Sequence, residues 1–281
     1  MNKIEKILDK MDMPEKQYSD LSRQLNQHLD NLKIISNKKK QPIIVTTWYF
    51  NRFHPHALNT TIAVKKSTDL VTIQTTIAEL TKTAKQHGCQ QLRLQYKNEE
   101  LPTDNWLTLL GFKEGRETII PTAKLSSIPN LSNDEKITFL SGQNVLDLAL
   151  TSNLIQLATE QYQTAHTISP VSELSKDEWQ TLFLTDAILD VPQVAIVDKK
   201  IIAWLFAYSD DSKQIEFAYH GGSIAAVKKL WSLDATIFIK RGYESWNKEF
   251  DSTDNIDQQL YPWLAKPSGP VYKTFWKTLL D

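Results

Sequence analysis

Apolar residues recur along this chain with two periodicities, one helical and one typical of strands. The two follow one another most clearly between Ala63 and Arg116. From Thr68 onward they return every three or four residues, at Leu70, Ile73, Ile77, Leu80 and Ala84. That spacing predicts an amphipathic helix, which Gly88 ends. Residues 91–96 then alternate between apolar and polar side chains, which predicts a strand. The order of strand, polar corner, helix and strand indicates an αβ unit.

The rest of the first half adds helices and strands around this unit. Residues 3–34 carry two apolar stripes at helical spacing and are predicted to be helical throughout. β-Branched and aromatic residues predict strands at 42–50 and 58–64. Further along the chain, a short helix is predicted at 104–110 and a strand at 112–120.

The second half repeats this order more coarsely between Gln214 and Trp276. A stretch rich in Ser, Pro and Asn precedes it, and we interpret residues 123–134 as a linker. The predicted domains are therefore 1–122 and 135–281. The elements expected in the second half are a strand at 137–140, helices between 146 and 189, a hairpin at 193–208, a strand at 214–220, a long helix after Gly221-Gly222-Ser223, a strand at 243–250, a short helix at 255–264 and a closing strand at 271–278.

Composition narrows the function classes without choosing one. The chain has 281 residues, 32 basic and 33 acidic side chains and a formal net charge of -1, which gives no electrostatic case for nucleic acid or an anionic membrane. The single cysteine, Cys89, excludes an internal disulfide and a cysteine-based zinc cage. We find no apolar run long enough for a membrane span and no signal-peptide core. We therefore expect a cytoplasmic, metal-free protein.

Each predicted αβ unit contains a distinctive stretch. The first half has Asn98 and then the run Trp106-Leu-Thr-Leu-Leu-Gly-Phe112, and the second half has Asn255 followed by Tyr261. These two stretches resemble the GNAT superfamily of acyl-CoA-dependent N-acetyltransferases. The resemblance implies an α/β fold of two tandem GNAT-like domains, each a central mixed sheet flanked by helices. It also implies acetyl-CoA as co-substrate.

The corner before each long helix is where GNAT enzymes hold the pyrophosphate of coenzyme A on backbone amides. Neither half has the glycine pattern of the family. In the first half the corner is Lys65-Lys66-Ser67-Thr68-Asp69, and the carboxylate of Asp69 is expected to cap the helix and repel phosphate. We therefore interpret the amino-terminal domain as degenerate.

The second corner contains Gly221-Gly222-Ser223 with Lys228 and Lys229 nearby, and it is a candidate phosphate cradle. An ordinary diglycine turn with a serine N-cap remains the alternative. As the resemblance implies, the preceding strand would pair with the pantetheine arm of the cofactor. The candidate cofactor-binding residues are Phe217, Ala218, Tyr219, Gly221, Gly222, Ser223, Ala225, Ala226 and Asn255.

Three side chains are candidates for catalysis in the second half. Glu216 could act as a general base, directly or through water, and His220 could share that role. By the resemblance, Tyr261 holds the position of the acid that protonates the leaving thiolate. The alternatives are a solvent-facing strand carboxylate, a structural histidine and a packed aromatic ring.

Two functions remain open after these observations. The first is an N-acetyltransferase whose carboxyl-terminal domain moves an acetyl group from acetyl-CoA to an amine on a small molecule or a protein, as a monomer or a homodimer. The second is a catalytically inactive binding or scaffold protein with the same fold. The acceptor is not specified by the sequence, because one fold serves many substrates.

Overall fold

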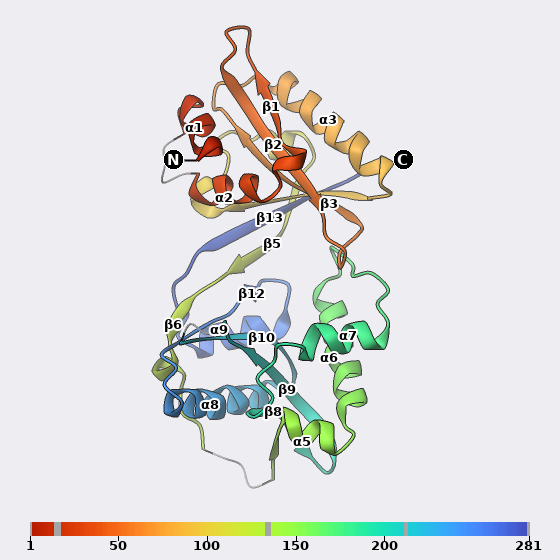
Figure 1. Cartoon of the computed structure of the whole chain (residues 1–281), viewed down its shortest axis with the longest axis vertical. Coiled ribbons are helices and arrows are strands. Elements are labelled where there is room, and N and C mark those ends of the chain that lie inside the picture. Colours follow the sequence, from red (N-terminus) through yellow and green to blue (C-terminus); the bar gives the residue numbers. More distant parts are fainter. Residues whose placement is uncertain (1, 14–17, 133–135, 211–212, 280–281) are drawn as a thin grey trace. The chain divides into compact units, whose positions relative to one another are not determined.

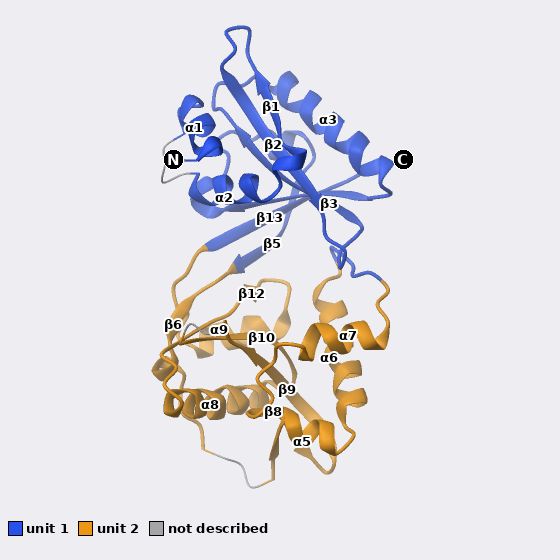
Figure 2. Ribbon diagram, in the orientation of Figure 1, with its two compact units in different colours: residues 1–118, 168–172, 271–281 blue, residues 119–167, 173–270 orange. Residues whose placement is uncertain are grey.

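The structure is a computed structural model that describes residues 2–13, 18–132, 136–210 and 213–279. Two compact units divide the chain (Figures 1 and 2). The first comprises residues 1–118, 168–172 and 271–281, and the second comprises residues 119–167 and 173–270. Both ends of the chain therefore belong to the first unit.

Helices and one mixed sheet make up the first unit. Its elements are α1 (Lys3–Lys10), α2 (Ser19–Gln27), the 3-10 turn η2 (Leu29–Asn31), β1 (Lys33–Ser36), β2 (Pro42–Phe50), β3 (Ala57–Val64), α3 (Leu70–Gln86), β4 (Gln91–Lys97), η3 (Asn98–Glu100), α4 (Trp106–Leu109), β5 (Lys113–Ile119), whose last residue lies at the boundary, and β13 (Val271–Thr278). Its strands run in the order β1-β2-β3-β4-β13-β5.

The second unit also contains one mixed sheet, in the order β6-β11-β10-β9-β8-β7. Its elements are β6 (Thr122–Lys124), η4 (Leu125–Ser127), β7 (Thr138–Ser141), α5 (Gly142–Asp147), α6 (Thr151–Ala165), α7 (Lys176–Leu184), β8 (Pro192–Val197), β9 (Lys200–Tyr208), β10 (Gln214–Gly222), α8 (Ile224–Lys240), β11 (Ser245–Asn247), β12 (Phe250–Asp251) and α9 (Asn255–Trp263).

One topological motif occurs in both units, which agrees with the repeat read from the sequence. A strand, a 17-residue helix and a second, parallel strand follow one another as β3, α3 and β4 in the first unit, and as β10, α8 and β11 in the second. The second strand of each motif then pairs antiparallel with a strand from elsewhere in the chain. That strand is β13 for β4, and β6 for β11.

Neither of these outer strands lies in the part of the fold to which the predicted domain boundaries assigned it. Residues 271–278, expected to close the carboxyl-terminal domain, pair with β4 from Tyr272–Lys97 to Thr278–Gln91. Residues 122–124, placed at the start of the linker, pair with β11 in the second unit. Local sequence cannot distinguish these partners, because a strand pattern specifies a pleated conformation and not its neighbour. Residues 133 and 134 of the expected linker lie outside the described residues.

A further difference lies near the amino terminus, where residues 3–34 were predicted to be helical. Helices α1 and α2 are present, but β1 pairs antiparallel with β2 and includes Lys33 and Ile34. Residues 14–17 lie outside the described residues. The remaining strands at 42–50, 57–64 and 91–97 confirm the predicted order.

Each unit has its own hydrophobic core. In the first, leucines of α1 and α2, apolar residues of the strands, and Ile73 and Ile77 of α3 belong to one buried cluster. In the second, α8 buries Leu230 and Trp231, and the Trp231 ring lies 4.3 Å from that of Phe217 on β10. Burying such rings stabilises the fold by roughly 2 kcal/mol each. No helix in the described ranges is long and apolar enough to cross a membrane.

Candidate functional site

The parallel strands β10 and β11 pair over a short distance and then separate. Their register is Gln214 with Ser245, Ile215 with Trp246 and Glu216 with Asn247. Beyond this point β10 is also irregular toward β9, because its register shifts between Phe217 and His220. A bulge of this kind leaves backbone groups without a ladder partner. Ala218 and Tyr219 lie in that section.

Strand β10 leads into helix α8, whose first turn has unused donors. The first helical hydrogen bond is donated by the Val227 amide to the Ser223 carbonyl, and the Ser223 side chain makes no cap. The Ser223 amide itself donates to the Ile202 carbonyl at 2.7 Å. Within the described part of the chain, the amides of residues 224–226 have no acceptor. Free amides and the helix dipole favour an anion at such an end.

The two glycines of this corner, predicted to bind the cofactor, belong to β10. They pair with β9, Gly221 opposite Trp204 and Gly222 opposite Ala203. A Cβ atom on Gly221 would lie 2.1 Å from the Trp204 ring, and one on Gly222 would lie 2.3 Å from the Ile202 carbonyl oxygen. Gly222 also has φ +91°. Packing against β9 therefore explains both glycines, and a close approach of phosphate is not needed to explain them.

The other residues predicted to bind the cofactor have varied surroundings. Phe217 is buried under α8, whereas Tyr219 is half-buried and its ring lies 5.0 Å from that of Phe183. Ala225 is exposed and Ala226 is buried in the first turn of α8. Asn255 is exposed at the start of α9, and its carbonyl accepts a hydrogen bond from the Gln259 amide group.

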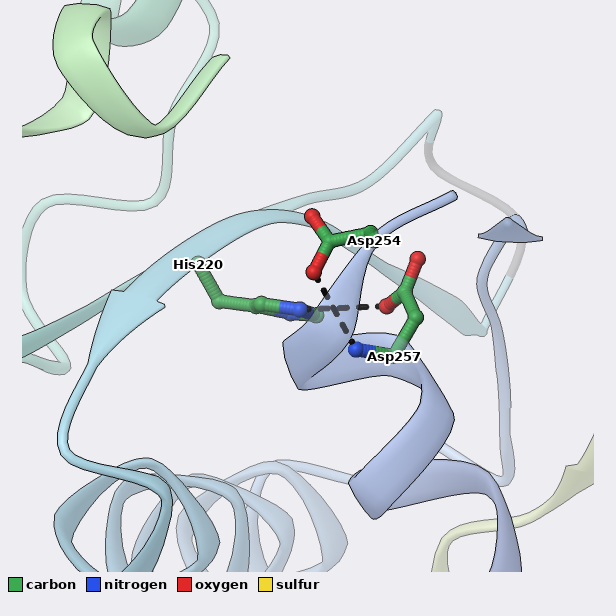
Figure 3. Close-up of side chains that lie close together, drawn as sticks. All are labelled: His220, Asp254 and Asp257. Carbon is green, nitrogen blue, oxygen red and sulfur yellow. Dashed lines mark hydrogen bonds and ion pairs between the residues drawn. The ribbon is translucent and has the colours of Figure 1, made fainter. Parts of the chain in front are cut away.

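A buried cluster of charged side chains lies beside the separated strands. His220 Nε2 and Lys248 Nζ each lie 3.1 Å from Oδ1 of Asp257, and all three side chains are buried. Figure 3 shows His220 on β10 pointing toward Asp254 and Asp257 at the start of α9. Asp254 caps that helix through the Ile256 amide at 2.7 Å. The cluster connects β10, the end of β11 and α9.

Burial and the neighbouring charges determine the protonation states of Asp257 and His220. Burial alone would raise the pKa of Asp257, but Lys248 and His220 together lower it to about 2. Burial and the neighbouring Lys248 lower the pKa of His220 below its usual value, against the opposing effect of Asp257. At neutral pH the arrangement is therefore a Lys248–Asp257 ion pair with a neutral His220. A side chain only 2% exposed is poorly placed to take a proton from an incoming amine.

Lys248 also reaches the irregular section of β10. Its Nζ donates to the Ala218 carbonyl at 3.1 Å. This is a backbone group that the GNAT resemblance assigns to the pantetheine arm. In this structure Lys248 satisfies the Ala218 carbonyl.

His220, Asp254 and Asp257 offer one ligand atom each within 4.8 Å of one another, a grouping that can hold a metal ion. The ammonium of Lys248 lies against the same Asp257 oxygen. A cation there would be repelled by the lysine and would have to displace it. The donor set fits an internal ion pair better than a metal centre.

The three predicted catalytic residues have different surroundings. Glu216 is exposed on β10, and His220 is enclosed in the ion cluster. Tyr261 is half-buried one helical turn after Asp257, and its hydroxyl donates to the Pro267 carbonyl at 3.3 Å. Burial raises the pKa of Tyr219, and the charges of Glu216 and Glu249 raise it further.

Sequence reasoning missed Lys248 and Asp257. A signal for Asp257 was present, since it falls beside Ile256 and one turn before Leu260 on the buried face of α9. A carboxylate among apolar positions indicates a buried partner. No comparable signal marks Lys248, which follows a strand and could equally face solvent.

The predicted loss of the phosphate corner in the first unit agrees with its geometry. Asp69 caps α3 by accepting hydrogen bonds from the Thr72 amide at 2.9 Å and the Thr72 hydroxyl at 2.8 Å. The carboxylate therefore occupies the helix end that an anion would need.

Solved structures share this arrangement of strands and helices. A GCN5-related N-acetyltransferase from Sphaerobacter thermophilus matches with a TM-score of 0.62 at 10% identity, covering 93% of this chain and 85% of the other. The chain has the GNAT fold. A functionally unknown conserved protein from Staphylococcus epidermidis ATCC 12228 matches with a TM-score of 0.51 at 13% identity, covering 91% and 98%.

The GNAT fold is not accompanied by a match in sequence. No protein-family model matches this chain, and no curated protein matches it either. At 10–13% identity the structural likeness establishes a mixed α/β fold with two helix-flanked sheets. The structural likeness does not specify the chemistry of the site.

Proposed function

We propose that this chain is an acyltransferase that moves an acyl group from acyl-CoA to an amine, with the site in its second unit. One observation carries the proposal. Strands β10 and β11 stop pairing after Glu216 and Asn247, and β10 then leads to the unused amides of residues 224–226. A divided strand pair next to a helix N-terminus suits an elongated ligand with phosphate at one end. The GNAT fold suggests acyl-CoA as that ligand.

Glu216 and Tyr261 would have separate roles in the transfer of the acyl group. The amine nitrogen would attack the thioester carbon and lose its proton to exposed Glu216, directly or through water. The carbon–sulfur bond would break, and the thiolate would take a proton from the Tyr261 hydroxyl. Backbone amides of the irregular section of β10 would stabilise the oxyanion. Acetyl-CoA is the donor proposed first.

Lys248 supports a second candidate function, a non-catalytic binding protein with the GNAT fold. Its bond to the Ala218 carbonyl occupies a backbone group that the pantetheine arm would otherwise use. The acyltransferase proposal therefore requires Lys248 to move when acyl-CoA enters. The binding-protein alternative requires no such movement.

Calorimetric titration of the full chain with acetyl-CoA tests the proposal. Ala225 is exposed in the first turn of α8, so Ala225→Asp introduces a carboxylate there without steric change to the core. An acidic residue in a first turn also stabilises a helix, which separates loss of binding from loss of folding. We expect Ala225→Asp to weaken acetyl-CoA binding about tenfold or more.

Two matched variants make the result specific. Ala225→Asn has nearly the same shape without the charge and should retain most of the affinity. Val71→Asp places the same charge at the same position of α3 in the first unit, where Val71 is 70% exposed, and should have no effect. Absence of acetyl-CoA binding to the unaltered chain would overturn the proposal and leave the binding-protein function.

A further inference from the structure

The first unit contains a partly enclosed polar cavity beneath helix α2, on a sheet face where side chains are normally apolar. The cavity has a volume of about 150 Å³ and lies between α2 and the strands β2, β3 and β4. Its floor includes three side chains in one row across the sheet, because Tyr49 pairs with Asn59 and Asn59 pairs with Arg93. A sheet face covered by a helix usually presents apolar side chains, so a polar row there needs a reason.

Asn59 gives the cavity an unused donor. Its side-chain oxygen accepts a hydrogen bond from Nη1 of Arg93 at 2.9 Å, which fixes the orientation of the amide. Its Nδ2 then has no hydrogen-bond partner among the described residues, although the side chain is 4% exposed. A buried amide left unpaired destabilises the folded chain. A ligand acceptor in the cavity would remove that destabilising effect.

The remaining lining is rich in donors and has no carboxylate. Arg23, Gln27 and His28 reach the cavity from α2 and the residue after it, and Arg93 reaches it from β4. No Asp or Glu is among the lining residues in the described part of the unit. Burial lowers the pKa of His28, and its ring stacks on Tyr49 with centroids 4.1 Å apart. Arg23 is paired with Asp20, which lies outside the lining, at 2.6 Å. Arg93 is therefore the cation that, beside the amide donor, favours a bound anion of planar, two-oxygen geometry.

We propose that this cavity binds a small carboxylate, with Asn59 Nδ2 as a donor to one carboxylate oxygen and the Arg93 guanidinium supplying positive charge. A cavity of about this volume is known to hold benzene, so the ligand is small, with roughly four to nine non-hydrogen atoms. Its affinity is expected to be about millimolar, since fragments gain limited free energy per atom. All its lining residues belong to the first unit, whereas the proposed acyl-CoA site lies in the second.

Nuclear magnetic resonance of the full chain tests this assignment with benzoate and acetate as probes. The expected result is a saturable shift of the Asn59 side-chain amide signals with a Kd of about 1 mM for at least one probe. Benzamide and acetamide, which have the same shapes without the charge, should bind at least about tenfold more weakly. Inorganic phosphate is the third comparison, and equal or tighter binding of phosphate would overturn the choice of a carboxylate.

The variant Asn59→Asp keeps the size of the side chain and can still pair with Arg93, but replaces the donor by a negative oxygen. It should weaken binding of the successful probe about tenfold or more. Asn98→Asp makes the same change at an exposed position of the same unit and should leave affinity unchanged. Lack of any saturable shift in the unaltered chain would overturn the proposal whether or not Asn59→Asp folds, and so would undiminished binding by a folded Asn59→Asp variant.

Discussion

Lys248 Nζ donates a hydrogen bond to the carbonyl oxygen of Ala218 at 3.1 Å, across the region where β10 and β11 have ceased to pair. The same ammonium is held by Asp257 from α9. A backbone group that a strand partner would normally satisfy is thus satisfied by a buried side chain. Access of any ligand to this region of β10 depends on that contact.

Removal of the lysine together with its counter-charge should open the region. In the double variant Lys248→Met/Asp257→Asn neither charge is left buried without a partner, which avoids the large cost of breaking a buried pair. We expect acetyl-CoA to bind about tenfold more tightly than to the unaltered chain, because no hydrogen bond to the Ala218 carbonyl has to be broken. Calorimetry gives the affinity. Weaker binding would show that Lys248 assists the ligand.

Substitution by alanine should destabilise the protein more at Gly222 than at Gly242. Gly222→Ala brings a Cβ to 2.3 Å from the Ile202 carbonyl oxygen at φ +91°. Gly242 in the same unit has φ +89° and no atom within 4 Å of a new Cβ. Gly242→Ala should reduce the free energy of unfolding by about 1 kcal/mol and Gly222→Ala by about 3 kcal/mol or more. Urea unfolding measures both, and equal losses would contradict the packing role of Gly222.

Stability of the first unit should depend on pH through Glu100. This buried carboxylate accepts hydrogen bonds from the Asp20 and Leu21 amides at 2.7 and 3.0 Å, at the start of α2. Burial raises its pKa to about 7, against the effect of those amides. The folded state therefore keeps a proton that the unfolded chain loses near its ordinary value of 4.5, and stability falls as pH rises between these values.

Comparison with the Glu100→Gln variant isolates the part of the pH-dependent stability that comes from Glu100. The unaltered chain should lose up to about 3 kcal/mol relative to the variant between pH 4.5 and 7, and the difference should be constant above pH 7. Urea unfolding at several pH values, followed by a probe in the first unit, gives the two curves. Parallel curves across this interval would refute a raised pKa for Glu100.

Tyr261→Phe tests the proposed acid. If the Tyr261 hydroxyl protonates the leaving thiolate, turnover should fall about a hundredfold with the affinity for acetyl-CoA unchanged. Release of free thiol with a panel of amine acceptors measures turnover. Tyr243→Phe removes a hydroxyl from another half-buried tyrosine of the second unit and is the matched control. Equal turnover in both variants would exclude Tyr261 from the reaction.

Local patterns predicted much of the fold because local interactions form it. The spacing of Ile73, Ile77 and Leu80 predicted α3, whose interior positions are buried as expected. Asp69 was predicted to cap that helix and does so. The order of strand, helix and strand, predicted in both halves, is present, and the structure adds that the two strands of each pair are parallel.

Features that depend on distant contacts were not predictable in this way. The use of Gly221 and Gly222 is decided by Trp204 and Ile202 of β9, which the local diglycine pattern does not reveal. The exclusion of His220 from solvent is decided by Lys248 and Asp257. A titratable side chain acquires its role from its neighbours, and those neighbours lie on other elements.

By itself, the sequence determined where helices and strands form, that the αβ order occurs twice, and that the first corner carries a helix-capping carboxylate. Spacing and capping act within a few residues, so they can be read along the chain. The tertiary structure alone decided that β13 completes the sheet of the first unit, that Lys248 satisfies the Ala218 carbonyl, and that Asn59 faces a cavity with an unused donor. These are pairings between segments far apart in sequence, and only packing selects them among many partners of similar local character.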